Sequence, residues 1–148
     1  MTTEELISFF ERDLDKLISE IELYKEEENI WKVERSISNP AGNLALHLVG
    51  NLNEFIGKYI GHTNYIRDRD LEFAQKNVAR TKIIEMIKDT QKMIRTSISM
   101  LSKEELEKDY PILKFSESCT TEYLLVHLMT HLTYHLGQIN YHRRLIEK

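Results

Sequence analysis

Glycine and proline are scarce in this sequence, at five and two among 148 residues. Both interrupt helices, so their scarcity favours long helical segments. No stretch shows the alternating apolar and polar pattern of a strand. An apolar fraction of 41% and a charged fraction of 30% are typical of a globular chain rather than a disordered one. The sequence therefore predicts an all-α fold in one domain, residues 1–148, large enough to bury a core.

Only one cysteine is present, Cys119, which excludes an intrachain disulfide and fits a reducing compartment. Its place just before the last expected helix would suit a thiol of lowered pKa with a catalytic role. A lone cysteine is more often inert, and we favour that interpretation.

The sequence also lacks an excess of positive charge and any long apolar run. A formal net charge of −4 gives no electrostatic footprint for nucleic acid. No apolar segment approaches the roughly 20 residues of a membrane span. The first thirteen residues are acidic and amphipathic, unlike a signal peptide. We therefore expect a soluble, cytoplasmic protein that binds neither nucleic acid nor a membrane.

Four segments have the apolar periodicity of bundle helices. The first opens at Thr2 and Glu5, which have the spacing of a capping box. The second opens with Asn39 as N-cap, followed by Pro40, and runs to about Ile60. The third covers residues 78–101 and the fourth residues 121–148. They predict an antiparallel four-helix bundle, in which the long connection at residues 61–77 could instead cross over.

The second of these helices is apolar around most of its circumference, which predicts that it is buried. The exception is a polar strip at every fourth residue, Asn43, His47 and Asn51. Such a strip faces either a narrow solvent window or an internal polar site, and the pattern alone favours the window for His47. Because one bundle core cannot cover so many apolar faces, we also expect a homodimer.

The last helix carries four of the six histidines, at positions 127, 131, 135 and 142. With Leu124 as the reference, a rotation of about 100° per residue places His131 and His135 in the middle of the core stripe. Imidazoles one helical turn apart can share one metal ion. His127 falls at the edge of the stripe and His142 lies two turns beyond His135, so neither is expected to be a ligand.

The connection between the second and third helices contains a mixed charge run that includes Arg67, Arg69 and Glu72. One interpretation is a solvated connection whose charges pair among themselves, and we favour it. The other is that Arg67 or Arg69 reaches over the mouth of a site and holds an anionic group.

Three sequence elements resemble the DinB/YfiT-type superfamily of metalloenzymes, and in particular one of its functionally uncharacterised bacterial branches. The elements are Asn39-Pro-Ala-Gly-Asn-Leu-Ala-Leu-His47-Leu-Val-Gly-Asn-Leu, Arg67-x-Arg69-x-x-Glu72-Phe73 and His131-x-x-x-His135-x-Gly137-Gln138. The resemblance covers nearly the whole chain, and the last element is its most specific part.

This resemblance implies an up-down-down-up four-helix bundle that is often dimeric. It also implies a divalent metal held by one histidine of the second helix and two of the last, which are His47, His131 and His135 here. It thereby turns His47 from a surface residue into a third ligand. Relatives of known activity include transferases that use a low-molecular-weight thiol.

Three neutral imidazoles would leave a zinc or nickel ion with at least one open position. That position could take water or a thiol and make it a nucleophile near neutral pH. Each ligating imidazole usually needs an acceptor on its other nitrogen. The candidate acceptors and pocket residues are Asn43, Asn51, Arg67, Arg69, Glu122 and Gln138.

Two functions remain open on the sequence. The first is a metal-dependent enzyme, a thiol transferase or a hydrolase, that acts on a small electrophilic substrate. The alternative is a non-catalytic, stress-related bundle that binds a ligand or partner without turnover.

Overall fold

The computed structural model describes residues 1–148 and is all-α, with 68% of the chain helical and no strand. This confirms the expected fold class. The helices are α1 (Thr3–Leu23), α2 (Ala41–Leu52), α3 (Arg69–Ala74), α4 (Arg80–Ser99), α5 (Lys103–Glu107) and α6 (Thr121–Ile146). A 3₁₀ turn covers Glu27–Trp31, and a π-helical segment, Asn53–Lys58, extends α2. None of these helices is long and apolar enough to cross a membrane.

The helix starts follow local side-chain chemistry. Thr2 and Glu5 form the expected capping box, so two otherwise unpaired backbone N–H groups of α1 are bonded. Thr120 caps α6 by accepting from the backbone N–H of Tyr123. Asn39 was expected to cap α2, but Pro40 holds the N-cap position and no side chain bonds there. The expectation was wrong because Asn39 lies one residue too early, and it lines a cavity instead.

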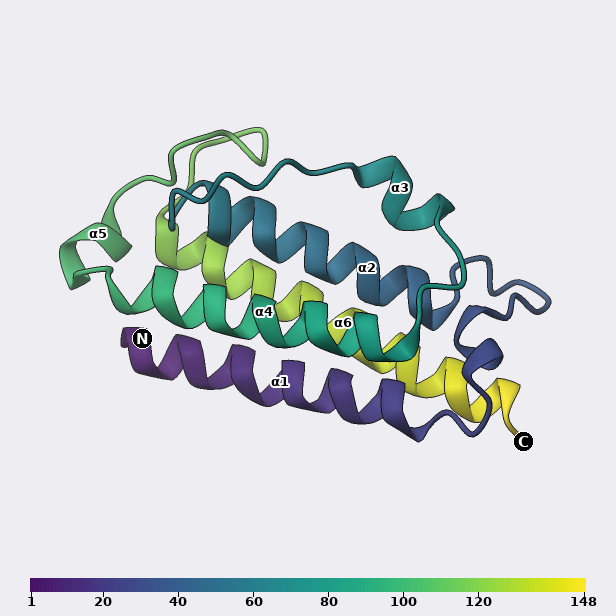
Figure 1. Cartoon of the computed structure of the whole chain (residues 1–148). Coiled ribbons are helices and arrows are strands. Elements are labelled where there is room, and N and C mark those ends of the chain that lie inside the picture. The colour runs from purple at the N-terminus through teal and green to yellow at the C-terminus, as the bar shows by residue number, and fades with distance from the viewer.

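Helices α1, α2, α4 and α6 lie side by side, with α1 and α2 each packed against both α4 and α6 (Figure 1). Arg95, late in α4, pairs with Glu4, early in α1, and Arg80 at the start of α4 donates to the carbonyl of Glu22 near the end of α1, so the two helices are antiparallel. Helices α1 and α6 run in the same direction, since Met1 bonds Glu122 near their starts and Tyr24 bonds His142 near their ends.

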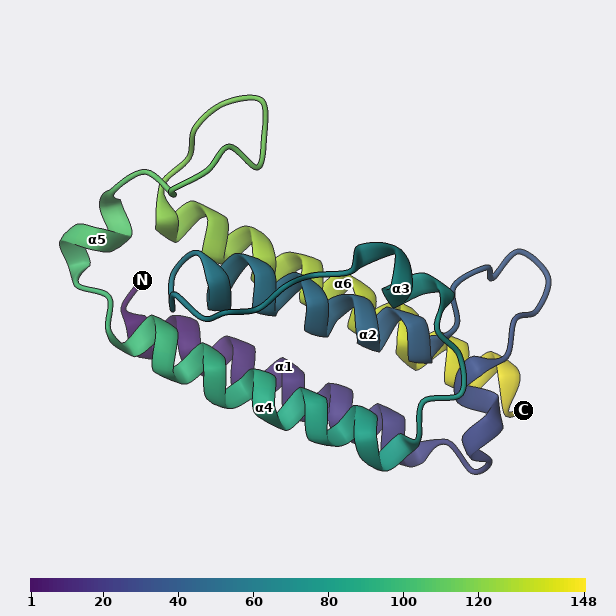
Figure 2. The ribbon, with the colours of Figure 1, turned by 45° about the horizontal axis from the view of Figure 1, so that its top comes forward.

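The chain between α2 and α4 crosses over, which is the alternative that the sequence left open. Residues 59–79, hereafter the crossover segment, return along the outside of α2 before α4 begins (Figures 1 and 2). The segment carries α3, which packs directly on α2. Every residue of α2 is consequently buried, and His47 is only 6% exposed.

This cover changes two expectations. The solvent window for His47 was wrong, because its polar strip faces the crossover segment rather than water. The homodimer stays a prediction, but the segment covers the surplus apolar faces of α2 from within the same chain, so they no longer argue for a second subunit.

The buried face of α6 is rotated from its expected position. It includes Leu125, Leu132 and Leu136 as well as Leu124 and Leu128. Its centre therefore lies about 60° from Leu124. His131 lies about 80° and His135 about 40° from this centre, and both are partly exposed rather than central. The expected centre was wrong because α6 packs on both α1 and α2, which widens its buried arc on one side.

His142 is a buried core residue that holds the ends of α1 and α6 together. Its Nδ1 lies 2.6 Å from the Tyr24 hydroxyl, and its Nε2 donates to the carbonyl of Lys32 at 2.8 Å. Because Nε2 is the donor, Nδ1 accepts from Tyr24. Burial lowers the pKa of His142, and the bond to Lys32 opposes that effect.

This lowered pKa predicts an acid-sensitive fold. In the unfolded chain a histidine has a pKa of about 6.5. Below that pH, His142 is protonated in the unfolded state but stays neutral in the folded state, where its pKa is lower. The free energy of unfolding of metal-free protein should therefore fall as the pH drops below about 6.5, by at most about 1.4 kcal/mol per pH unit for each such histidine. In urea titrations between pH 7.5 and 5.5, His142→Gln should show a shallower loss than the wild type. His62→Gln, at an exposed position, is the control, and equal slopes in all three proteins would contradict the prediction.

Candidate metal centre

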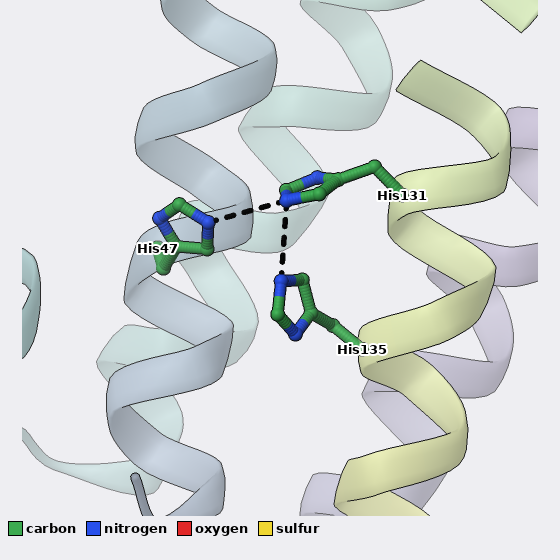
Figure 3. A group of neighbouring side chains, drawn as sticks. All are labelled: His47, His131 and His135. Carbon is green, nitrogen blue, oxygen red and sulfur yellow. Dashed lines mark hydrogen bonds between the residues drawn. The ribbon is translucent and has the colours of Figure 1, made fainter. Parts of the chain in front are cut away.

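Three histidines from two helices turn the same ring nitrogen toward one point (Figure 3). The Nε2 atom of His131 lies 3.3 Å from that of His47 and 3.1 Å from that of His135. The three candidate ligand atoms all lie within 4.8 Å of one another. In four-coordinate zinc sites with bonds of about 2.0–2.1 Å, neighbouring ligand atoms are about 3.3 Å apart. The two shorter separations thus suit a common ion.

Helix geometry explains the convergence. His131 and His135 are one turn apart on α6, so their rings project side by side. Helix α2 faces that edge of α6 and brings His47 opposite them. The rings of His131 and His135 are perpendicular, with centroids 4.5 Å apart, and this orientation brings their Nε2 atoms to 3.1 Å.

Hydrogen-bond partners fix which nitrogens carry protons. Nδ1 of His47 lies 3.1 Å from Glu72 Oε1, and Nδ1 of His135 lies 2.7 Å from Gln138 Oε1. Because both oxygens accept, both Nδ1 atoms donate, which leaves two bare Nε2 lone pairs aimed at His131. One N–H on His131 could satisfy only one of them, and its own Nδ1 is buried without a partner. A bound cation would satisfy all three lone pairs, so the donor set fits a metal ion.

The acceptor for His47 was missed in the sequence. Glu72 was read as part of a solvated charge run, but it is 7% exposed and it also receives two hydrogen bonds from Arg67, at 2.9 and 3.0 Å. Arg67 is thus paired within the run, as expected, but the pair is buried beside the site. Burial would raise the pKa of Glu72, yet the hydrogen bonds from His47 and Arg67 outweigh it and hold the pKa below its usual value.

Of the other four candidate acceptors, only one bonds a histidine of the site. Gln138 does bond a candidate ligand, as described for His135. Asn43 donates to the carbonyls of Glu72 and Gln75 and so anchors the crossover segment rather than a ligand. Asn51, the last residue of α2's polar strip, is buried with its side-chain oxygen unpaired. Glu122 pairs with the N-terminal amine of the chain instead.

Burial favours the neutral form of the two candidate ligands on α6. It lowers the pKa of His131 to about 4, and the neighbouring His135 and His47 add to the effect. It also lowers the pKa of His135, against the bond to Gln138. Neutral imidazole is the form that binds metals, so these two rings are ready to do so near pH 7.

The three histidines open onto a cavity of about 590 Å³. Its wall also includes Arg69, Phe73, Leu44 and Tyr141. A space of this size suits a small organic molecule. The arrangement therefore combines convergent ligand atoms with room for a substrate beside them.

The remaining histidine of α6 and the cysteine lie outside this set. His127 packs on Phe115, with centroids 4.9 Å apart, and is absent from the convergent group. Cys119 lines a different cavity, which contains none of the three ligands. Burial and the nearby Asp109 raise the pKa of its thiol. That direction is opposite to the one a reactive thiol requires.

Together the fold and the site define an all-helical protein with a three-histidine cluster that could hold a metal ion. The chain belongs to the family described as "Protein of unknown function (DUF1572)", whose sequence pattern matches residues 3–148. No curated protein matches the chain.

Proposed function

We propose that this protein is a metal-dependent enzyme in which His47, His131 and His135 bind one divalent ion, zinc or nickel. The observation that carries the proposal is the convergence of three Nε2 atoms, two of which are held in the metal-binding tautomer by Glu72 and Gln138. A core histidine such as His142 also has hydrogen-bond partners, but both of its ring nitrogens are bonded, whereas here two bare Nε2 atoms face a third.

The bound ion would supply a Lewis acid that lowers the pKa of a bound thiol or water. The chain's own contribution is to hold three neutral ligands on one side and to leave the cavity side free of any other candidate ligand. A small electrophile in the cavity would then meet the nucleophile. The proposed reactions are thiol transfer and hydrolysis.

The finer fold assignment also belongs to this proposal. The two outer helices in sequence, α1 and α6, run one way and α2 and α4 run the other, which supports the up-down-down-up bundle of the DinB/YfiT type (Figure 1). The family match over residues 3–148 supports one domain. A non-catalytic, ligand-binding bundle is the alternative, and a metal site closed to exogenous ligands would favour it.

Cobalt(II) distinguishes these functions, because its visible and near-ultraviolet spectrum reports each new ligand. Adding a small thiol to the cobalt-loaded protein should produce a thiolate-to-cobalt charge-transfer band that saturates at one equivalent. His127→Ala should behave as the wild type. A spectrum that stays unchanged at millimolar thiol would show a closed site and would contradict the proposed enzyme.

A further inference from the structure

The cavity beside the three histidines is lined by a cationic side chain but by no acidic one. The protein contains 24 acidic residues, yet none of the residues that line this cavity is an aspartate or glutamate. Its only permanently charged lining residue is Arg69. A divalent ion at the histidines would add further positive charge.

The structure separates the two arginines that the sequence left as alternatives. Arg67 is committed to the buried Glu72, with its side chain only 12% exposed. Arg69 makes no ion pair or hydrogen bond with any side chain, and it lies over the ring of Phe73, 5.4 Å from the centroid. Its five N–H donors therefore remain available to a ligand.

Arg69 is also close enough to the histidines to share one ligand with them. The Phe73 ring also packs against His47, with ring centroids 4.9 Å apart, so Arg69 and His47 both contact the same ring. Both residues line the same cavity, together with His131 and His135. Further apolar wall comes from Leu44, Ile37 and Leu145. A molecule that reaches from Arg69 to the histidines would be short, with an apolar middle.

On these grounds, and resting on the proposed function, we infer that the substrate or thiol is a small organic anion. Its negative group, a carboxylate or an equivalent oxyanion, binds Arg69, and its reacting atom faces the three Nε2 atoms. A guanidinium matches a carboxylate with two parallel hydrogen bonds, which gives orientation as well as affinity. Arg69 would be a specificity-determining residue.

Matched thiols test this inference. In cobalt-loaded protein, the charge-transfer band gives the Kd of 3-mercaptopropionate and of its neutral amide, 3-mercaptopropanamide. The carboxylate should bind more tightly in the wild type. A charge-assisted hydrogen bond is worth about 1.5–3 kcal/mol, so Arg69→Gln should weaken the carboxylate about 10- to 100-fold and change the amide less than twofold. Arg95→Gln removes the same charge from the α1–α4 surface and should leave both values unchanged.

Equal affinity for both thiols in the wild type, or equal loss of both in Arg69→Gln, would overturn the inference. A second measurement separates it from the proposed function. In metal-free protein, the Arg69 Nε–H signal, assigned by its loss in Arg69→Gln, should shift when 3-mercaptopropionate is added but not with the amide. If no thiol gives a charge-transfer band, the proposed enzyme fails while a carboxylate-specific shift still supports the anion site. An unshifted Arg69 signal would overturn the anion site by itself.

Discussion

Replacing His131 or His135 with alanine is expected to abolish stoichiometric metal binding. Protein purified without a histidine tag should hold close to one equivalent of divalent metal, and each variant close to none after dialysis. Structural zinc sites with four ligands in zinc-finger peptides bind the ion with about 10–16 kcal/mol. Losing one of three imidazoles therefore removes several kcal/mol. His47→Ala should have the same effect, although its ligand comes from the other helix.

The control histidines should behave differently. His127→Ala should keep its metal and its stability, because the ring lies outside the convergent group. His142→Ala should keep its metal yet lose about 2–4 kcal/mol of folding stability, since it leaves a cavity and two unpaired polar groups. Elemental analysis and urea unfolding of each folded variant provide the two readouts. Full metal content in His131→Ala and His135→Ala would refute the site.

Replacing Gly50 with alanine is expected to destabilise the protein and weaken metal binding by displacing Glu72, the acceptor of His47. A Cβ atom there would lie 1.8 Å from Glu72 Oε2, so the carboxylate must move away. Arg67 would then lose its buried partner and His47 its acceptor. Breaking a buried pair costs about 3–5 kcal/mol, and the helix propensity of alanine returns about 1, so we expect a net loss of about 2–4 kcal/mol. Metal affinity should fall about 10- to 100-fold.

Two comparisons isolate the clash. Gly137→Ala is the same substitution on α6, where an added Cβ meets nothing within 4 Å. It should stabilise the protein by about 1 kcal/mol. In a Glu72→Ala background, Gly50→Ala should lose most of its cost, because the clashing carboxylate is gone. A Gly50→Ala protein as stable as Gly137→Ala would contradict the proposed contact.

Much of the fold was predictable because it depends on local patterns. The scarcity of glycine and proline and the 3.6-residue apolar spacing indicated the long helices, and a capping box marked the start of α1. The pairing of His131 with His135 followed from one helical turn. Each of these inferences needs only residues close together in the sequence.

The missed features depend on contacts between distant segments. The polar strip of α2 gave no sign of what would cover it, so the pattern alone favoured an exposed His47, and only the resemblance made it a candidate ligand. Glu72 lies 25 residues from His47, inside a charge run typical of a solvated loop. The glycine at position 50 was the only local signal for its approach, and glycine alone does not say what lies opposite.

The crossover segment divides the protein into parts that could be altered separately. The bundle helices supply the three nitrogen ligands, whereas Glu72, Arg69 and Phe73 arrive on a strap outside the four-helix core. Exchanging residues of the crossover segment other than Glu72, Arg67 and its core residue Ile60 would leave the three candidate ligands and the acceptor of His47 in place. Such chimaeras would offer a route to redesigned substrate selectivity on a constant metal-binding scaffold.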